Sequence, residues 1–255
     1  SVHIMAASLF LLMLVPVIGS NRGGAKRWID LGFTTFQPSA IAKLAVIICF
    51  AAMICSFGKK KMGTFKYGVL PFAGVLGAVV GLLILEPHLS ASVIILAVGA
   101  IMMFAGGTRL HWFAGLGALA AGGGAIAVTK LDYAAKRIAT WKDPLSDLQG
   151  DGWQIIQSLY AVGSGGFLGL GLGQGRQKYL YLPEEHNDFI FAVVCEELGF
   201  VGAALILLLF ALLIVRGYWL AMHARDKFSS LLVTGITSLL AIQVFLNVAV
   251  VTNLL

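Results

Sequence analysis

The chain has 255 residues, of which 59% are hydrophobic and 12% are charged, with a mean hydropathy of +0.91 and a formal net charge of +6. So few polar residues cannot cover the surface of a water-soluble domain of this length, and the composition predicts an integral membrane protein. The cations lie mainly in short loops between apolar runs, so they report membrane topology and do not indicate nucleic-acid binding.

About seven apolar runs have the length of a membrane span, which predicts an all-α, polytopic transmembrane helical bundle. The runs are continuous, unlike the short alternating strands of an outer-membrane barrel. In chain order they are Ile4 to Gly19, Pro38 to Phe57, Tyr67 to Leu85, Leu89 to Ala105, Trp112 to Thr129, Phe189 to Val215 and Ser229 to Leu255.

The cations of three short loops fall on one side of these alternating spans, and the positive-inside rule makes that side cytoplasmic. The opposite face then holds residues 130–187, which we expect to form a long extracytoplasmic loop within a single membrane domain, 1–255. Within this loop, Trp153 to Ala161 are expected to form a short amphipathic helix. The chain begins just before one apolar run and ends inside another, so we expect it to be a fragment of a longer protein.

Three acids mark the run that follows this loop. Asp188 is the last polar residue before the run, and Glu196 and Glu197 lie roughly 12 Å further along a helix, where an ionisable group is costly unless paired or hydrated. On a helical projection only Glu196 lies near the Asp188 face, so we expect only Glu196 to share its polar cavity. The alternatives are helix capping by Asp188 and structural pairing of the two glutamates.

The loop contains a glycine-rich stretch, residues 163–175, and several cations. The stretch lacks the preceding strand and the Gly-Lys-Ser/Thr ending of a nucleotide-binding loop, so close packing or a re-entrant loop is favoured, while a backbone cradle for another phosphate stays open. Cations beside a carboxylate suit group transfer from a phosphate leaving group, although solvated surface charges are the alternative. These cations are Lys136, Arg137, Lys142, Arg176 and Lys178.

The same residues resemble the SEDS family (shape, elongation, division and sporulation), which includes FtsW, RodA and SpoVE. The Glu86–Ser90 motif, Glu-Pro-His-Leu-Ser, is closer to the FtsW and SpoVE branch than to RodA. The matching motifs occur in order over almost the whole chain, and they include Phe36 to Lys43, Glu86 to Ser90, Lys136 to Ile138, Gly163 to Gly166, Tyr181 to Phe191 and Glu196 to Gly199.

The resemblance implies a fragment covering about the third to the ninth of ten spans. It implies a peptidoglycan glycosyltransferase that polymerises lipid II, an undecaprenyl-diphosphate-linked disaccharide peptide, at the outer face of the bacterial cytoplasmic membrane, with a class B penicillin-binding transpeptidase as partner. The family's essential aspartate falls on Asp188, which would be the general base of an inverting transfer. The residues implied to contact the substrate are Lys43, Arg137, Arg176, Lys178, Glu184, Glu196 and Glu197.

Two other functions stay open at this point. A lipid II flippase would use Lys43, Glu196 and Glu197 as a path through the bilayer, because buried charges often line such paths. A non-catalytic scaffold would only recruit the transpeptidase. A divalent cation such as Mg or Mn would help a diphosphate to leave, but the sequence shows no recognisable set of metal ligands. No organic cofactor and no nucleic-acid partner are expected.

Overall fold

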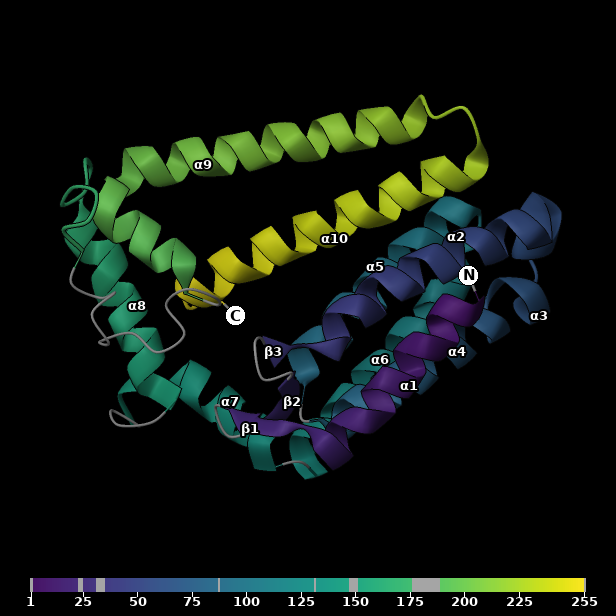
Figure 1. The fold of residues 1–255 in the computed structure, drawn as a ribbon, viewed down its shortest axis with the longest axis horizontal. Helices are drawn as coiled ribbons and strands as arrows, with labels where there is room; N and C mark the ends of the chain where they lie inside the picture. Colours follow the sequence, from purple (N-terminus) through teal and green to yellow (C-terminus); the bar gives the residue numbers. More distant parts are fainter. Residues whose placement is uncertain are drawn as a thin grey trace. The chain divides into compact units, whose positions relative to one another are not determined.

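The computed structural model describes residues 2–22, 25–30, 35–86, 88–130, 132–146, 151–175 and 189–254 (Figure 1). The chain divides into two compact units. The first comprises residues 1–120 with 216–240, and the second comprises residues 121–215 with 241–255. Three helices contribute residues to both units.

The first unit is a bundle of apolar helices, because each of its long hydrophobic runs satisfies its own backbone hydrogen bonds within a helix. Helix α2 packs against α1 and α5, and α4 packs against α5. At the centre the rings of Phe50 and Phe72 meet edge to face at 4.8 Å, and both side chains are fully buried. The helices are α1 (Val2–Ile18), α2 (Pro38–Met62), α3 (Phe65–Gly68), α4 (Leu70–Leu85), α5 (Leu89–Gly106) and the first half of α6 (Leu110–Lys130).

Prolines and glycines set the helix boundaries in this unit. Pro38 opens α2, a position where its missing N–H group is not needed. Gly107 ends α5 in the left-handed conformation, at φ 97°, and its N–H donates to the carbonyls of Met103 and Phe104. Gly58, at φ 70°, interrupts α2 just before its basic last turn.

A small antiparallel sheet joins α1 to α2, and the sequence analysis did not predict it. Its strands are β1 (Ser20–Arg22), β2 (Ala25–Asp30) and β3 (Thr35–Phe36), in the order β1-β2-β3. Ser20 pairs with Trp28 and Ile29 pairs with Phe36. The all-α class is confirmed for the spans, and the connection before the second span adds this sheet.

The second unit is built around α8 (Asp151–Gly165), with α7 (Asp132–Lys142) and the short 3₁₀ helix η1 (Pro144–Ser146) before it. The predicted short amphipathic helix, Trp153 to Ala161, is confirmed within α8. The first part of α9 (Ile190–Met222) and the last part of α10 (Lys227–Val251) complete the unit. The Ser158 hydroxyl lies 2.8 Å from the Ile155 carbonyl and 3.1 Å from that of Val251, which ties α8 to the end of α10.

The described residues of the seven predicted apolar runs lie mainly in helices. Five described helices are long and apolar enough to cross a membrane, and α1 is a shorter apolar helix. The five are Pro38–Met62, Phe65–Leu85, Leu89–Gly106, Ile190–Met222 and Lys227–Val251. A multi-pass helical membrane protein is therefore established, and the total of seven spans stays a prediction, as does the single-domain boundary 1–255.

Candidate functional site

Helix α9 is broken at Gly199, where φ is 65° and ψ is −169°. A break in a membrane helix frees backbone groups that lipid cannot satisfy. Here the glycine-rich loop supplies the partners: the amides of Leu170 and Gly171 donate to the carbonyls of Glu196 and Glu197 at 3.0 and 3.1 Å. In the other direction, the amides of Phe200 and Val201 donate to the carbonyls of Gly166 and Phe167, at 2.9 and 3.1 Å. The loop and the helix break therefore form one hydrogen-bonded structure.

Two glycines make this close approach feasible. Gly169 and Gly199 both have positive φ, at 79° and 65°, a region that residues with a Cβ rarely adopt. A Cβ on Gly169 would collide with the Glu197 carbonyl oxygen, and a Cβ on Gly199 would collide with the Gly169 nitrogen. Close packing, one of the two favoured sequence interpretations of residues 163–175, is thus supported from Gly165 onward. The other, a re-entrant loop, stays a prediction.

The alternative interpretation of this loop, a backbone cradle for a phosphate, loses five of its possible amide donors. The amides of Leu170 and Gly171 are bonded to α9, the Gly169 amide donates to the Gly165 carbonyl, and the Gln174 amide donates to the Gly171 carbonyl. A fifth amide, that of Gly173, donates to the Glu197 side chain. A phosphate would have to displace these bonds.

The carboxylates of Glu196 and Glu197 converge on the end of the loop. The Gly173 amide lies 3.0 Å from Oε2 of Glu197. A Cβ on Gly175 would lie 2.9 Å from Oε2 of Glu196 and 3.0 Å from Oε1 of Glu197, so both carboxyl groups crowd this glycine. Glu196 is buried, with 2% of its surface exposed. The projection that separates the two glutamates by face does not account for this convergence, because side chains of adjacent residues can bend toward one neighbour.

Four of the predicted site residues lie outside the described part of the chain. They are Arg176, Lys178, Glu184 and Asp188. The residues on either side of this segment are described, and both are anchored on the first half of α9. Gly175 is buried against Glu196 and Glu197, and Phe189 is buried in a cluster with Ala161, Ala192 and Val251. The predicted sharing of a cavity by Asp188 and Glu196 stays a prediction.

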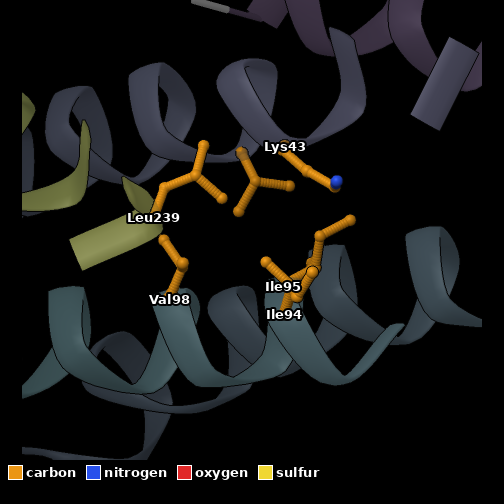
Figure 2. A pocket seen from close by; sticks show the side chains of 6 residues that line it. Lys43, Ile94, Ile95, Val98 and Leu239 are labelled. Carbon is orange, nitrogen blue, oxygen red and sulfur yellow. The ribbon is translucent and has the colours of Figure 1, made fainter. Parts of the chain in front are cut away.

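Two further predicted site residues belong to other elements. Arg137 lies in α7, and its side chain is not among those described. Lys43 is half-buried on α2 in the first unit, beside a small recess that is otherwise apolar (Figure 2). The recess is lined by Lys43, Val46, Ile94, Ile95, Val98 and Leu239.

Sequence analysis missed one buried acid. Glu86, between α4 and α5, is 1% exposed, and neither carboxylate oxygen has a hydrogen bond to any described atom. Burial raises the pKa of Glu86 from its ordinary value of 4.5 to about 7, and the nearby charge of Arg27 on β2 opposes this rise. Its position in the Glu86–Ser90 motif was visible in the sequence, but nothing there showed that the side chain points inward.

The described residues offer no group of three or more His, Cys, Asp or Glu that could hold a metal ion. The divalent cation considered from the sequence therefore finds no ligand set in this part of the chain. The divalent cation stays a prediction.

Long apolar helices, a broken helix and a glycine loop folded onto the break define a multi-pass membrane protein with a polar site beside one span. The chain belongs to the FtsW, RodA and SpoVE family of cell cycle proteins, whose model matches residues 1–255. It is 42% identical over 247 residues to stage V sporulation protein E of Bacillus subtilis (strain 168), covering 97% of this chain and 67% of that protein.

Two further similarities bear on the site. The chain is 42% identical over 247 residues to the "Probable peptidoglycan glycosyltransferase FtsW" of Geobacter sp. (strain M18), covering 97% of this chain and 67% of the relative. A solved structure described as "Structural coordination of polymerization and crosslinking by a peptidoglycan synthase complex" matches with a TM-score of 0.78 and 32% identity, over 98% of this chain and 69% of that one. The chain thus spans about two thirds of the length of these relatives.

Proposed function

We propose that the protein polymerises lipid II at the outer face of the bacterial cytoplasmic membrane. Several relatives at 37–44% identity over nearly the whole chain are named peptidoglycan glycosyltransferase, and they assign the chain to this enzyme class. The observation that carries the proposal is the match of one family model to residues 1–255, including the acidic motif that ends at Asp188.

The proposed chemistry is an inverting glycosyl transfer. The Asp188 carboxylate takes the proton from the 4-hydroxyl group of the acceptor sugar, and the hydroxyl oxygen attacks the anomeric carbon of the donor. The bond from that carbon to the diphosphate oxygen breaks, and undecaprenyl diphosphate leaves with the bonding electrons. Arg137, Arg176 and Lys178 stabilise the charge that develops on the diphosphate, and Lys43 contributes positive potential.

The described residues on either side of residues 176–188 support the proposal. Gly175 packs against Glu196 and Glu197 of α9, and Phe189, just before α9, packs in the cluster of Ala161, Ala192 and Val251. Both residues are thus held by described parts of the second unit. We assign Glu184, within residues 176–188, to the acceptor saccharide.

A partner protein is also proposed, on the basis of a related solved structure. The related solved structure is described as a peptidoglycan synthase complex that coordinates polymerisation and crosslinking. We propose that this protein likewise works with a class B penicillin-binding transpeptidase, which would crosslink the glycan strands that it makes.

The test is Asp188→Asn in the full-length protein, purified and supplied with lipid II and with the transpeptidase. The substitution is nearly isosteric, so we expect unchanged folding and loss of glycan strands on gels. Glycan synthesis at the wild-type rate would rule out Asp188 as the base. The wild-type protein separates the alternatives. If it makes no glycan but translocates lipid in vesicles, the flippase is supported, and if it shows neither activity, the scaffold is supported.

A further inference from the structure

The glycine-rich loop exposes a concentrated set of large apolar side chains. Leu168 and Leu172 are 82% and 77% exposed, and Phe167 and Leu170 are also exposed. Residues 163–175 contain no ionisable side chain. Isolated exposed hydrophobic residues are ordinary, but four within six residues of an irregular loop form a patch that needs an apolar environment.

The patch is continuous with the exposed surface of α9. The rings of Phe167 and Phe200 are in contact, with centroids 6.0 Å apart, and Phe200 and Val201 are exposed on the helix just after the break. The exposed surface continues along the helix through Leu205, Leu208, Leu209 and Leu212. Because α9 is a membrane-spanning helix, these leucines identify a lipid-facing surface, and the loop extends it.

Helix length places the break at the edge of the hydrocarbon. Residues 199–215 carry no charge, and the next residue is Arg216. These residues make about 25 Å of helix, slightly less than the roughly 30 Å thickness of the hydrocarbon core. With Arg216 at one boundary of the membrane, Gly199 lies just inside the other, and so do the loop residues bonded to it.

Many backbone groups of the loop have protein partners. Irregular backbone at membrane depth is stable only where its polar groups are satisfied by protein. Five loop amides, those of Gly169, Leu170, Gly171, Gly173 and Gln174, donate to protein acceptors, and two loop carbonyls accept from Phe200 and Val201. These seven polar groups face α9 or the loop itself, while the four large apolar side chains are exposed.

We propose that the loop 166–173 is immersed in the membrane, with Phe167, Leu168, Leu170 and Leu172 in contact with lipid acyl chains. The broken helix and the loop act together as an anchor at the membrane edge. The carboxyl groups of Glu196 and Glu197 lie against the end of the same loop, at Gly173 and Gly175, so the anchor also sets the depth of Gly175. The immersion follows from exposure and bonding in this chain and does not depend on the proposed enzymatic activity.

The test uses nitroxide spin labels in the full-length protein. Cys49, Cys55 and Cys195 are changed to alanine, single cysteines are introduced by Leu168→Cys or Leu172→Cys, and the labelled protein is reconstituted in phosphatidylethanolamine and phosphatidylglycerol vesicles. Power saturation compares collisions with oxygen, which concentrates in lipid, and with a water-soluble nickel chelate. Leu209→Cys gives the lipid-facing reference and Lys142→Cys gives the reference in water, since both residues are exposed.

We expect both loop labels to show more relaxation by oxygen than by nickel, as at Leu209, with the opposite order at Lys142. Nickel dominating at positions 168 and 172 would place the loop in water and overturn the proposal. Low accessibility to both reagents would show that another protein segment covers the loop, which would overturn it as well. Glycan synthesis does not enter the readout, so its loss would bear only on the proposed function.

Discussion

Glu197 and Gly173 are joined by a hydrogen bond of 3.0 Å from the glycine amide to Oε2 of the glutamate. The residues are 24 positions apart, and the bond crosses from the end of the glycine-rich loop to the last turn before the break in α9. A charged acceptor makes this bond stronger than one between neutral groups. Glu197 therefore acts on the loop backbone and positions the end of the glycine-rich loop.

Removing this acceptor should release the end of the loop. For Glu197→Ala we expect the Gly173 amide to lose about 2 kcal/mol of protection, roughly a thirtyfold faster hydrogen exchange. Glu197→Gln keeps an acceptor oxygen and should show a smaller change. The measurement is hydrogen exchange by mass spectrometry at single-amide resolution.

The internal control for this experiment is the Gly171 amide, which donates to the Glu197 carbonyl and not to its side chain. Its protection should change less than that of Gly173 in either variant. Equal protection of Gly173 in the wild type and in Glu197→Ala would show that the carboxylate does not hold the loop.

The sequence predicted the elements that depend on local pattern and missed those that depend on distant pairing. The apolar runs, the start of α2 at Pro38 and the helix around Trp153 follow from hydrophobicity and local backbone preference, and the structure contains each of them. The break at Gly199 does not follow, because glycine is common within membrane helices. Only the bonds from residues 166–171, about 30 positions earlier, show that this glycine interrupts the helix.

The site also depends on side-chain directions that a sequence pattern does not show. A helical projection places Cα atoms and cannot show that the side chains of Glu196 and Glu197 both bend toward Gly175. It also cannot show that Glu86 points into the protein, because a residue in a turn between two helices has no periodic face. The three strands around Trp28 depend on pairing across turns, which the search for apolar runs did not address.

Gly199→Ala should destabilise the second unit. The new Cβ would require φ near 65° and would collide with the Gly169 nitrogen, so we expect a loss of at least about 2 kcal/mol. The measurement is thermal unfolding of the purified protein in detergent. Gly163→Ala on α8 is the matched control, since nothing lies within 4 Å of its Cβ position, and it should be neutral or stabilising by about 0.5 kcal/mol. Equal unfolding temperatures for the two variants would contradict the strain at Gly199.

Lys43→Met should separate charge from packing in the first unit. Methionine has a similar length and suits the aliphatic recess around Lys43, so we expect stability to fall by less than about 1 kcal/mol. If the positive charge acts on the diphosphate, glycan synthesis should fall at least about tenfold, the loss of one charged interaction of roughly 1.4 kcal/mol. Lys60→Met, at an exposed position in the basic last turn of the same helix, is the control and should leave both properties unchanged. Full activity of the Lys43 variant would remove this residue from the proposed site.

Glu86 should make stability depend on pH in the direction opposite to that of a paired carboxylate. Its pKa is about 7 in the folded protein, against an ordinary value of 4.5, because the buried carboxyl resists ionisation more than the charge of Arg27 favours it. Between these values the folded state holds a proton that the unfolded state has lost. Stability should therefore fall as pH rises from about 4.5 to about 7, by about 3 kcal/mol in total, and should level off above pH 7.

Glu86→Gln tests this dependence, because glutamine has the shape of the protonated acid and does not titrate. We expect the variant to match the wild type near pH 4.5 and to unfold at a higher temperature from pH 7 upward, in thermal unfolding of the purified protein. Asp226→Asn should give the opposite result, since hydrogen bonds from Ser229 lower the pKa of the exposed Asp226 and favour its charged form in the folded state. Its stability should fall below that of the wild type at neutral pH. A constant difference between Glu86→Gln and the wild type from pH 4.5 to pH 8 would show that Glu86 ionises in the folded protein as readily as in the unfolded chain.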